Sequence, residues 1–171
     1  IWHGPNGEAW QLVSAKAGNL IRVHEAATGK WLRDGGTTGR GPAQFERPNG
    51  LAVSGDLLWV VERDGRRVQV LQLPAFTPLG SYGEDDLVKP YGVTIADQGA
   101  GRYRTWITDS YELVADSVPP DSALGRRVRE YQVVVEGGRA TAKLLRTFGD
   151  TTGAGVLRVV ESIMADPVND Q

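Results

Sequence analysis

The feature that most constrains this 171-residue chain is an internal repeat. Residues 48–83 are matched, in the same order, by segments spread over 90–149. An earlier copy is visible from Trp10, and a fourth opens at Val160. An ordered series of matches is the signature of a repeat architecture. The equivalent pairs are Pro48 and Pro90, Gly50 and Gly92, Trp59 and Trp106, Arg67 and Arg127, and Gly83 and Gly149.

Each unit contains four short segments rich in β-forming residues and bounded by Gly, Asp and Pro. In the clearest copy these segments are 51–53, 57–62, 67–73 and 78–82. Four strands in about 40–45 residues make one propeller blade. A β-sandwich also has recurring short strands, but it does not require matching sequences every four strands.

The sequence therefore predicts an all-β fold, a β-propeller of four-stranded antiparallel blades. We expect a single partial domain, about three and a half blades of a ring with about six. The third unit is lengthened by two insertions, Gln98–Arg104 and Leu113–Leu124. The blades are expected at about 1–36, 37–83 and 84–149, with 150–171 as the start of a further blade.

Composition excludes several classes of function. The 19 Lys and Arg residues face 21 Asp and Glu residues, so no basic surface for nucleic acid is indicated. No apolar run reaches the roughly 18 residues of a membrane helix. The absence of cysteine excludes disulfides and thiol chemistry.

The repeat also predicts a binding site. In an up-and-down blade the first strand starts at the end where the second strand finishes, and in a propeller these points line the mouth of the central channel. Equivalent positions there differ between copies, unlike the repeated Gly and Trp positions. They are Asn49, Tyr91 and Glu161 at the starts of first strands, and Lys16, Arg63 and Ser110 at the ends of second strands.

These side chains suggest a metal-bridged phosphate. Lys16 and Arg63 would attract an anion, and the planar guanidinium suits phosphate. Glu161 and Asn49 offer oxygen ligands of the kind that Ca²⁺ prefers, and Tyr91 offers a hydroxyl donor. The alternative is that the two cations are solvated turn residues, that Glu161 caps a turn, and that Tyr91 is packing.

The same segments resemble the β-propeller phytases, calcium-dependent enzymes that release phosphate from inositol hexakisphosphate. Ile1-Trp2 resembles the end of the family's "DDPAIW" motif. Lys16 in VSAKAGNLIRVHEAATGK resembles the Lys of "DKxGGLxVYDLxGK", and Arg63 in VVERDGR resembles the family's second-blade Arg. Tyr91 in PYGVTIA matches the "YG" segment, and Glu161 in VESIMADPVND resembles the Glu of "EGxxADDExG".

This resemblance implies a phosphomonoesterase that acts on phytate or another phosphorylated small molecule, in an extracellular or periplasmic location. It implies that Lys16, Arg63 and Tyr91 bind phosphate and that Glu161, with Asn49, holds Ca²⁺; no catalytic residue is identified. The chain departs from the family where Ser110 replaces a third-blade Lys. It departs again where Ala52 replaces the Asp of an "NNVD" turn.

Two other readings stay open. Residues 48–53 and the closing Gly83 look equally like an NHL repeat, which would predict a non-catalytic module that binds protein or carbohydrate. A sugar-lactonase-like propeller would also place Glu and Asn at a metal in the channel mouth.

Overall fold

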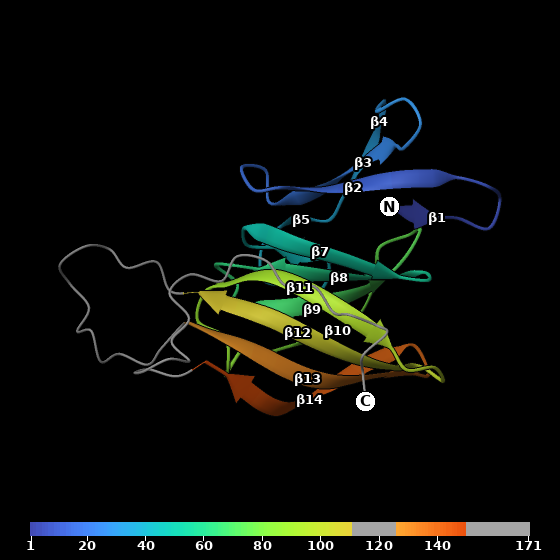
Figure 1. Cartoon of the computed structure of the whole chain (residues 1–171). Helices are drawn as coiled ribbons and strands as arrows, with labels where there is room; N and C mark the ends of the chain where they lie inside the picture. The colour runs from blue at the N-terminus through green and yellow to red at the C-terminus, as the bar shows by residue number, and fades with distance from the viewer. Residues whose placement is uncertain (111–125, 150–171) are drawn as a thin grey trace.

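The computed structural model of the chain describes residues 1–110 and 126–149. In these residues the fold is all-β, and its main body is three four-stranded antiparallel sheets that lie side by side (Figure 1). The described part of the chain contains no helix that is long and apolar enough to cross a membrane.

The three sheets follow one another along the chain, and each is an up-and-down meander. The first sheet contains β1 (Trp2–His3), β2 (Ala9–Ala15), β3 (Leu20–Glu25) and β4 (Trp31–Gly35). The second contains β7 (Pro48–Ser54), β8 (Leu57–Glu62), β9 (Arg67–Gln72) and β10 (Thr77–Tyr82). The third contains β11 (Pro90–Asp97), β12 (Arg102–Ser110), β13 (Arg126–Glu136) and β14 (Arg139–Phe148).

A short parallel pair, β5 (Thr37–Thr38) and β6 (Gln44–Phe45), lies in the link from the first sheet to the second. This link, residues 36–47, returns the chain from the last strand of one sheet to the first strand of the next.

The register of the strands confirms the repeat. Pro48 lies opposite Glu62 in the second sheet, just as Pro90 lies opposite Asp109 in the third. In both sheets the pairing is irregular over the two residues after the proline. The predicted four-strand unit is therefore confirmed, and the sheets are compatible with propeller blades.

The first predicted insertion, Gln98–Arg104, extends a hairpin, because β12 already begins at Arg102. Its Tyr103 packs edge-on against Trp59 of the second sheet, with ring centroids 5.0 Å apart. The second insertion, Leu113–Leu124, and the expected fourth unit, 150–171, lie outside the described residues.

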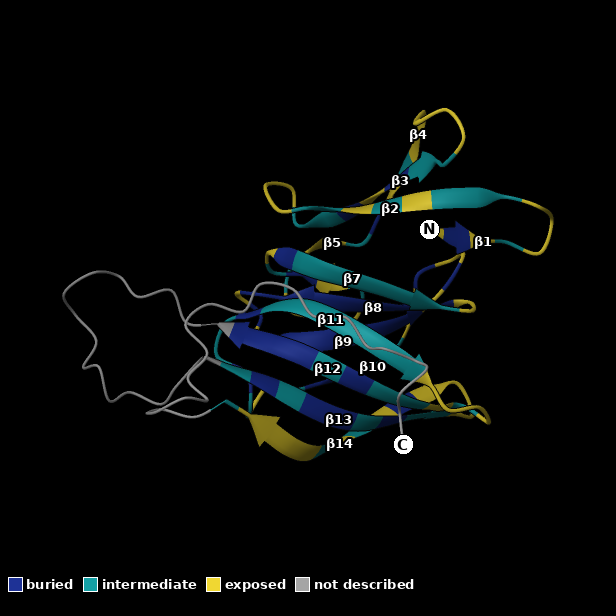
Figure 2. Cartoon of the chain, viewed as in Figure 1, coloured by how far each residue is buried: buried dark blue, intermediate teal, exposed yellow. Residues whose placement is uncertain are grey.

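The core consists of two apolar layers, one on each face of the second sheet (Figure 2). Successive side chains of a strand point to opposite faces, so β8 contributes to both layers. Trp59 and Val61 lie in the layer shared with the third sheet, and Leu58 and Val60 in the layer shared with the first. Every residue of β8 is buried, which makes the second sheet the centre of the structure.

Gly50 sets how closely the second and third sheets approach. A Cβ at this position would lie 2.5 Å from the carbonyl oxygen of Tyr91 in β11. The close approach requires glycine at position 50, because the same Cβ would also lie 2.9 Å from the Cα of Gly92.

We predict that Trp59→Ala destabilises the chain by about 3–5 kcal/mol, because it opens a cavity in the layer between two sheets. Trp59 is completely inaccessible to solvent. Urea unfolding followed by circular dichroism measures the change. Trp31→Ala is the matched control, since Trp31 is 55% exposed, and it should cost less than about 1 kcal/mol. Equal losses for the two variants would contradict the packing described here.

Candidate functional site

The candidate site lies at the end of the sheets where β7 and β11 begin and where β2, β8 and β12 finish. We call this the shared end; it is on the left in Figure 1. Neighbouring sheets touch here: the Ser14 hydroxyl of β2 donates a hydrogen bond of 2.8 Å to the carbonyl oxygen of Asn49 in β7. The predicted positions on the three sheets therefore belong to one region of the molecule.

The structure brings two of the predicted residues into contact. Arg63 follows β8 in a turn, and its guanidinium carbon lies 5.0 Å from the centre of the Tyr91 ring. The contact joins the second sheet to the third, and only 7% of Arg63 is exposed. A cation over an aromatic face is attracted by the ring quadrupole, so Tyr91 orients Arg63 and keeps its positive charge at the shared end.

The other predicted residues are placed differently. Lys16 is exposed in the turn between β2 and β3, at the same end but on the first sheet. Asn49 is half-buried near the start of β7. Ser110 ends β12, and Ala52 lies within β7, opposite Trp59. Glu161 lies outside the described residues.

Two buried carboxylates, which the sequence reasoning missed, organise this end; we call Glu62 and Asp109 the strand-end carboxylates. They occupy equivalent positions at or near the ends of β8 and β12, and neither is accessible to solvent. Each accepts hydrogen bonding from backbone N–H in the segment that precedes the first strand of its own sheet. The signal was visible in the repeat, because an acid stands in both copies just before Arg63 and Ser110.

Glu62 lies at the centre of a buried network. Its Oε1 accepts hydrogen bonds of 2.7 Å from Nε of Arg67 and from the Gln69 amide, and its Oε2 accepts one of 2.8 Å from the Glu46 N–H. Arg67 then donates to the carbonyl oxygens of Arg40 and Gln44 in the link. The network fixes the link that leads to Asn49.

Asp109 has the same role in the third sheet. Its Oδ1 accepts hydrogen bonds from the backbone N–H groups of Val88 and Lys89, at 3.0 and 2.8 Å. Burial raises the pKa of Asp109 above its ordinary value, and these bonds and the charge of Arg129 offset the rise only in part. The bonds hold the residues just before Pro90 and Tyr91.

Two further cations flank the site at another repeated position. Arg47 and Lys89 directly precede Pro48 and Pro90. Arg47 has a φ of 55°, and its carbonyl oxygen accepts a 3.0 Å hydrogen bond from the Arg63 N–H. A positive φ is unfavourable for a non-glycine residue, so the surrounding contacts must hold Arg47 in place.

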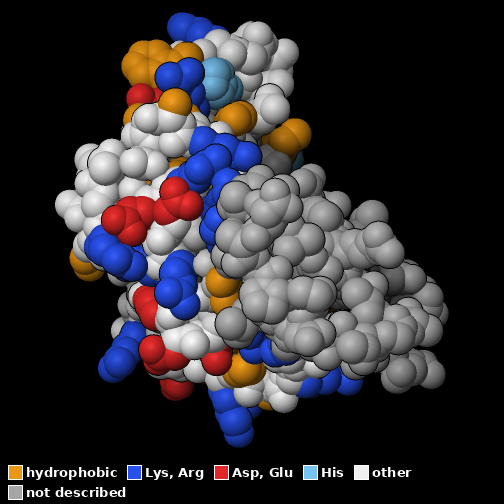
Figure 3. Space-filling model, turned by 90° about the vertical axis from the view of Figure 1, so that its left-hand side faces the viewer, with side chains coloured by type: hydrophobic (Ala, Val, Ile, Leu, Met, Phe, Trp, Pro, Cys, Tyr) orange, Lys and Arg blue, Asp and Glu red, His pale blue; other side chains and the backbone are white. Residues whose placement is uncertain are grey.

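The view onto the shared end in Figure 3 shows Lys and Arg side chains gathered across it, with Asp and Glu among them. One of these acids, Asp64, lies 3.9 Å from the Arg47 guanidinium. The strand-end carboxylates are buried and hydrogen-bonded, so they contribute little to the charge of this exposed surface.

Calcium does not fit the described residues by themselves. They contain no group of three or more His, Cys, Asp or Glu side chains that could hold a metal ion. The strand-end carboxylates are already occupied by hydrogen bonds. Of the two expected ligands only Asn49 lies in the described part, and it offers a neutral oxygen.

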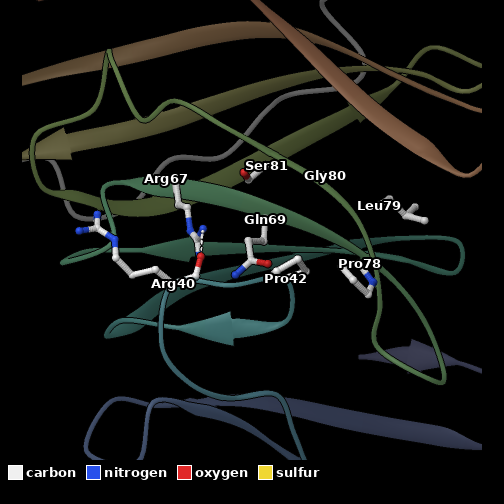
Figure 4. A pocket seen from close by; sticks show the side chains of 8 residues that line it. All are labelled: Arg40, Pro42, Arg67, Gln69, Pro78, Leu79, Gly80 and Ser81. Atoms are coloured by element: carbon white, nitrogen blue, oxygen red, sulfur yellow. Dashed lines mark hydrogen bonds between the residues drawn. The ribbon is translucent and has the colours of Figure 1, made fainter.

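A cavity of about 440 Å³ borders the Glu62 network (Figure 4). Its lining includes Arg67 and Gln69, together with Pro42 and Pro78. None of Lys16, Asn49, Arg63 and Tyr91 lines it, so this cavity is separate from the candidate site.

No model of a known protein family matches the chain, and no curated protein matches it significantly. The resemblance to phytases and to NHL repeats therefore stays a prediction.

We predict that Asp109→Asn changes how stability depends on pH. Because the pKa of Asp109 is raised in the folded state, ionisation of this residue disfavours folding. Its contribution to stability is most favourable below the ordinary value of 3.8, and it falls as pH rises through the raised folded pKa. The free energy of unfolding of the native chain, minus that of the Asn variant, should therefore decrease as the pH rises from 3.8 to the raised pKa of Asp109.

Chemical denaturation at a series of pH values measures this difference. Asp64→Asn serves as the control, since Asp64 is exposed, and its difference from the native chain should stay nearly constant. An increase of the Asp109 difference with pH would contradict the assigned environment.

Proposed function

We propose that the protein binds a phosphorylated small molecule at the shared end of its sheets. We propose further that the protein hydrolyses this molecule as a phytase-like, calcium-dependent phosphomonoesterase. The supporting observation is the Arg63–Tyr91 contact, which keeps a guanidinium at this end across two sheets. Arg63 is the residue we expect to orient phosphate, because its planar fork can donate to two oxygens at once.

Lys16 extends this positive region onto the first sheet, where its exposed ammonium can approach another oxygen of the ligand. The Tyr91 hydroxyl is the proposed hydrogen-bond donor. Calcium would be held with the help of Asn49 and of Glu161, which lies outside the described residues. The metal would supply charge neutralisation of the phosphate.

We also propose that the three sheets are blades of a larger propeller with about six blades. The repeated register of the second and third sheets, and their side-by-side packing, support this arrangement. In such a ring the shared end would be the channel mouth.

The test is release of phosphate from phytate by the full-length protein with Ca²⁺, and again with excess chelator. We expect chelator-sensitive release. Arg63→Lys keeps the charge but loses the fork, and it should lower kcat/KM by about tenfold or more, the effect of losing a hydrogen bond to a charged group. Tyr91→Phe keeps the ring under Arg63 and tests the hydroxyl alone.

Arg102→Lys is the matched control, because Arg102 is exposed at the opposite end of β12, and its activity should be unchanged. Unfolding curves of all variants separate lost activity from lost structure. Absence of chelator-sensitive release from phytate and from simple phosphomonoesters would exclude the proposed activity.

A second candidate is a non-catalytic, NHL-type binding module. It is favoured by one observation: two of the described acids at the shared end, Glu62 and Asp109, are used within the fold. For this candidate we expect no chelator-sensitive hydrolysis of phosphomonoesters. We also expect that neither calcium nor inorganic phosphate alters the thermal midpoint of unfolding, in the native chain or in an Arg63 variant.

A further inference from the structure

The cavity that borders the Glu62 network lies between the second sheet and the link, residues 36–47 (Figure 4). Its volume of about 440 Å³ is in the range of sites that hold a small organic ligand. The second sheet has the first sheet on one face and the third on the other (Figure 1). A further sheet would pack on the first or the third, so it would not cover this cavity.

The repeat shows why the second sheet has this cavity. Gln69 lies opposite Ser81 across β9 and β10, and the equivalent pair in the third sheet is Arg129 and Thr147. Arg129 donates a 3.1 Å hydrogen bond to Thr147 Oγ1 and a 2.8 Å bond to the carbonyl oxygen of Asp86. It therefore spans the space between its sheet and the segment that precedes it. Gln69 is shorter than arginine, and the space beside Ser81 stays open.

The link before the second sheet is also longer than the one before the third, which runs only over 83–89. The longer link places Arg40 and Pro42 beside β9 and β10, where both line the cavity. It is held there by Arg67, which donates to the carbonyl oxygen of Arg40, and by Gln69, which accepts from the Ala43 N–H. Unfilled space loses packing contacts, so a ligand that occupied it would stabilise the folded chain.

The lining combines positive charge with apolar surface. Its ionisable residues are Arg40 and Arg67, and no Asp or Glu of the described residues lines it. Pro42, Pro78 and Leu79 form its apolar part. Figure 4 shows Arg40 at one end of the lining, with Pro78 and Leu79 at the other. This arrangement suits a ligand with a negative charge at one end and an apolar body at the other.

Arg40 is the residue that we expect to bind the charge of the ligand. The charge of Arg67 is already paired with buried Glu62. The side chain of Arg40 is 67% exposed, and its contacts in the described part of the chain use Nε and Nη2. Its Nε lies 3.3 Å from Glu46, and its Nη2 donates over 3.5 Å to the carbonyl oxygen of Gly65. Nη1 is left to donate to an oxygen of a ligand.

We propose that this cavity binds a small organic carboxylate, with the carboxylate at Arg40 and an apolar ring or chain against Pro42 and Pro78. A guanidinium matches a carboxylate in shape and charge. A phosphate dianion fits less well, because the apolar part of the lining cannot replace the water that it would lose. The ligand is therefore different from the phosphorylated molecule proposed for the shared end, and none of Lys16, Arg63 and Tyr91 lines the cavity.

The test is an NMR titration of the isotope-labelled full chain with naphthoate, and with naphthamide as the neutral probe of the same shape. We expect naphthoate to shift the amide signals of Gly41, Gly80 and Ser81, in or beside the lining, and to bind several-fold more tightly than naphthamide. Arg40→Gln removes the guanidinium but keeps the carbonyl oxygen that Arg67 binds. It should weaken naphthoate binding by about three- to fivefold, as expected for an ion pair that stays partly exposed.

Arg102→Gln is the matched control, because it removes an exposed cation that does not line the cavity, and the affinity for naphthoate should be unchanged. Circular dichroism checks that both variants fold. Absence of naphthoate binding, equal affinity for the two probes, or unchanged affinity in Arg40→Gln would overturn the proposal. Shifts centred on the amides of Arg63 and Tyr91 would also overturn it, because naphthoate would then occupy the shared end.

Discussion

The buried carboxylate of Glu62 is the interaction on which the rest of the shared end depends. A fully desolvated charge is tolerated only when it is paired and hydrogen-bonded, and Glu62 receives donors from Arg67, Gln69 and the Glu46 backbone. The side-chain donors come from one strand, β9, and the backbone donor comes from the link between sheets. The Glu62 charge therefore joins strand β9 to the irregular link. Apolar packing alone would orient the link less specifically.

Apolar packing and this network have different roles. The two layers on either side of β8 hold the three sheets together, and their contribution is roughly proportional to the area that they bury. Phe45 anchors the link in the layer shared with the first sheet, but residues 36–47 are otherwise mostly polar or glycine. Glu62 holds the polar part of the link through the Glu46 N–H, and Asp109 holds the residues before Tyr91, whose ring lies against the Arg63 guanidinium.

The repeat allowed the sheets and the shared end to be predicted from the sequence, because blade topology converts sequence spacing into spatial position. It correctly separated repeated residues such as Trp59 from variable ones such as Arg63. It did not reveal that Arg63 lies over Tyr91, because contacts between sheets depend on how they pack. Glu62 was missed because an acid at the last position of a predicted strand is usually a solvated residue beside a turn, and its burial could not be known from the sequence.

The strand-end carboxylates fix the backbone of the candidate site through these hydrogen bonds. Native-state hydrogen exchange of the Glu46 and Lys89 amides in the full chain tests it most directly, with Glu62→Gln as the perturbation. We expect both amides to be protected like those of β8, and we expect the substitution to accelerate exchange at Glu46 while Lys89 keeps its protection. Exchange of both amides at the rate of exposed turns in the unmodified chain would contradict it.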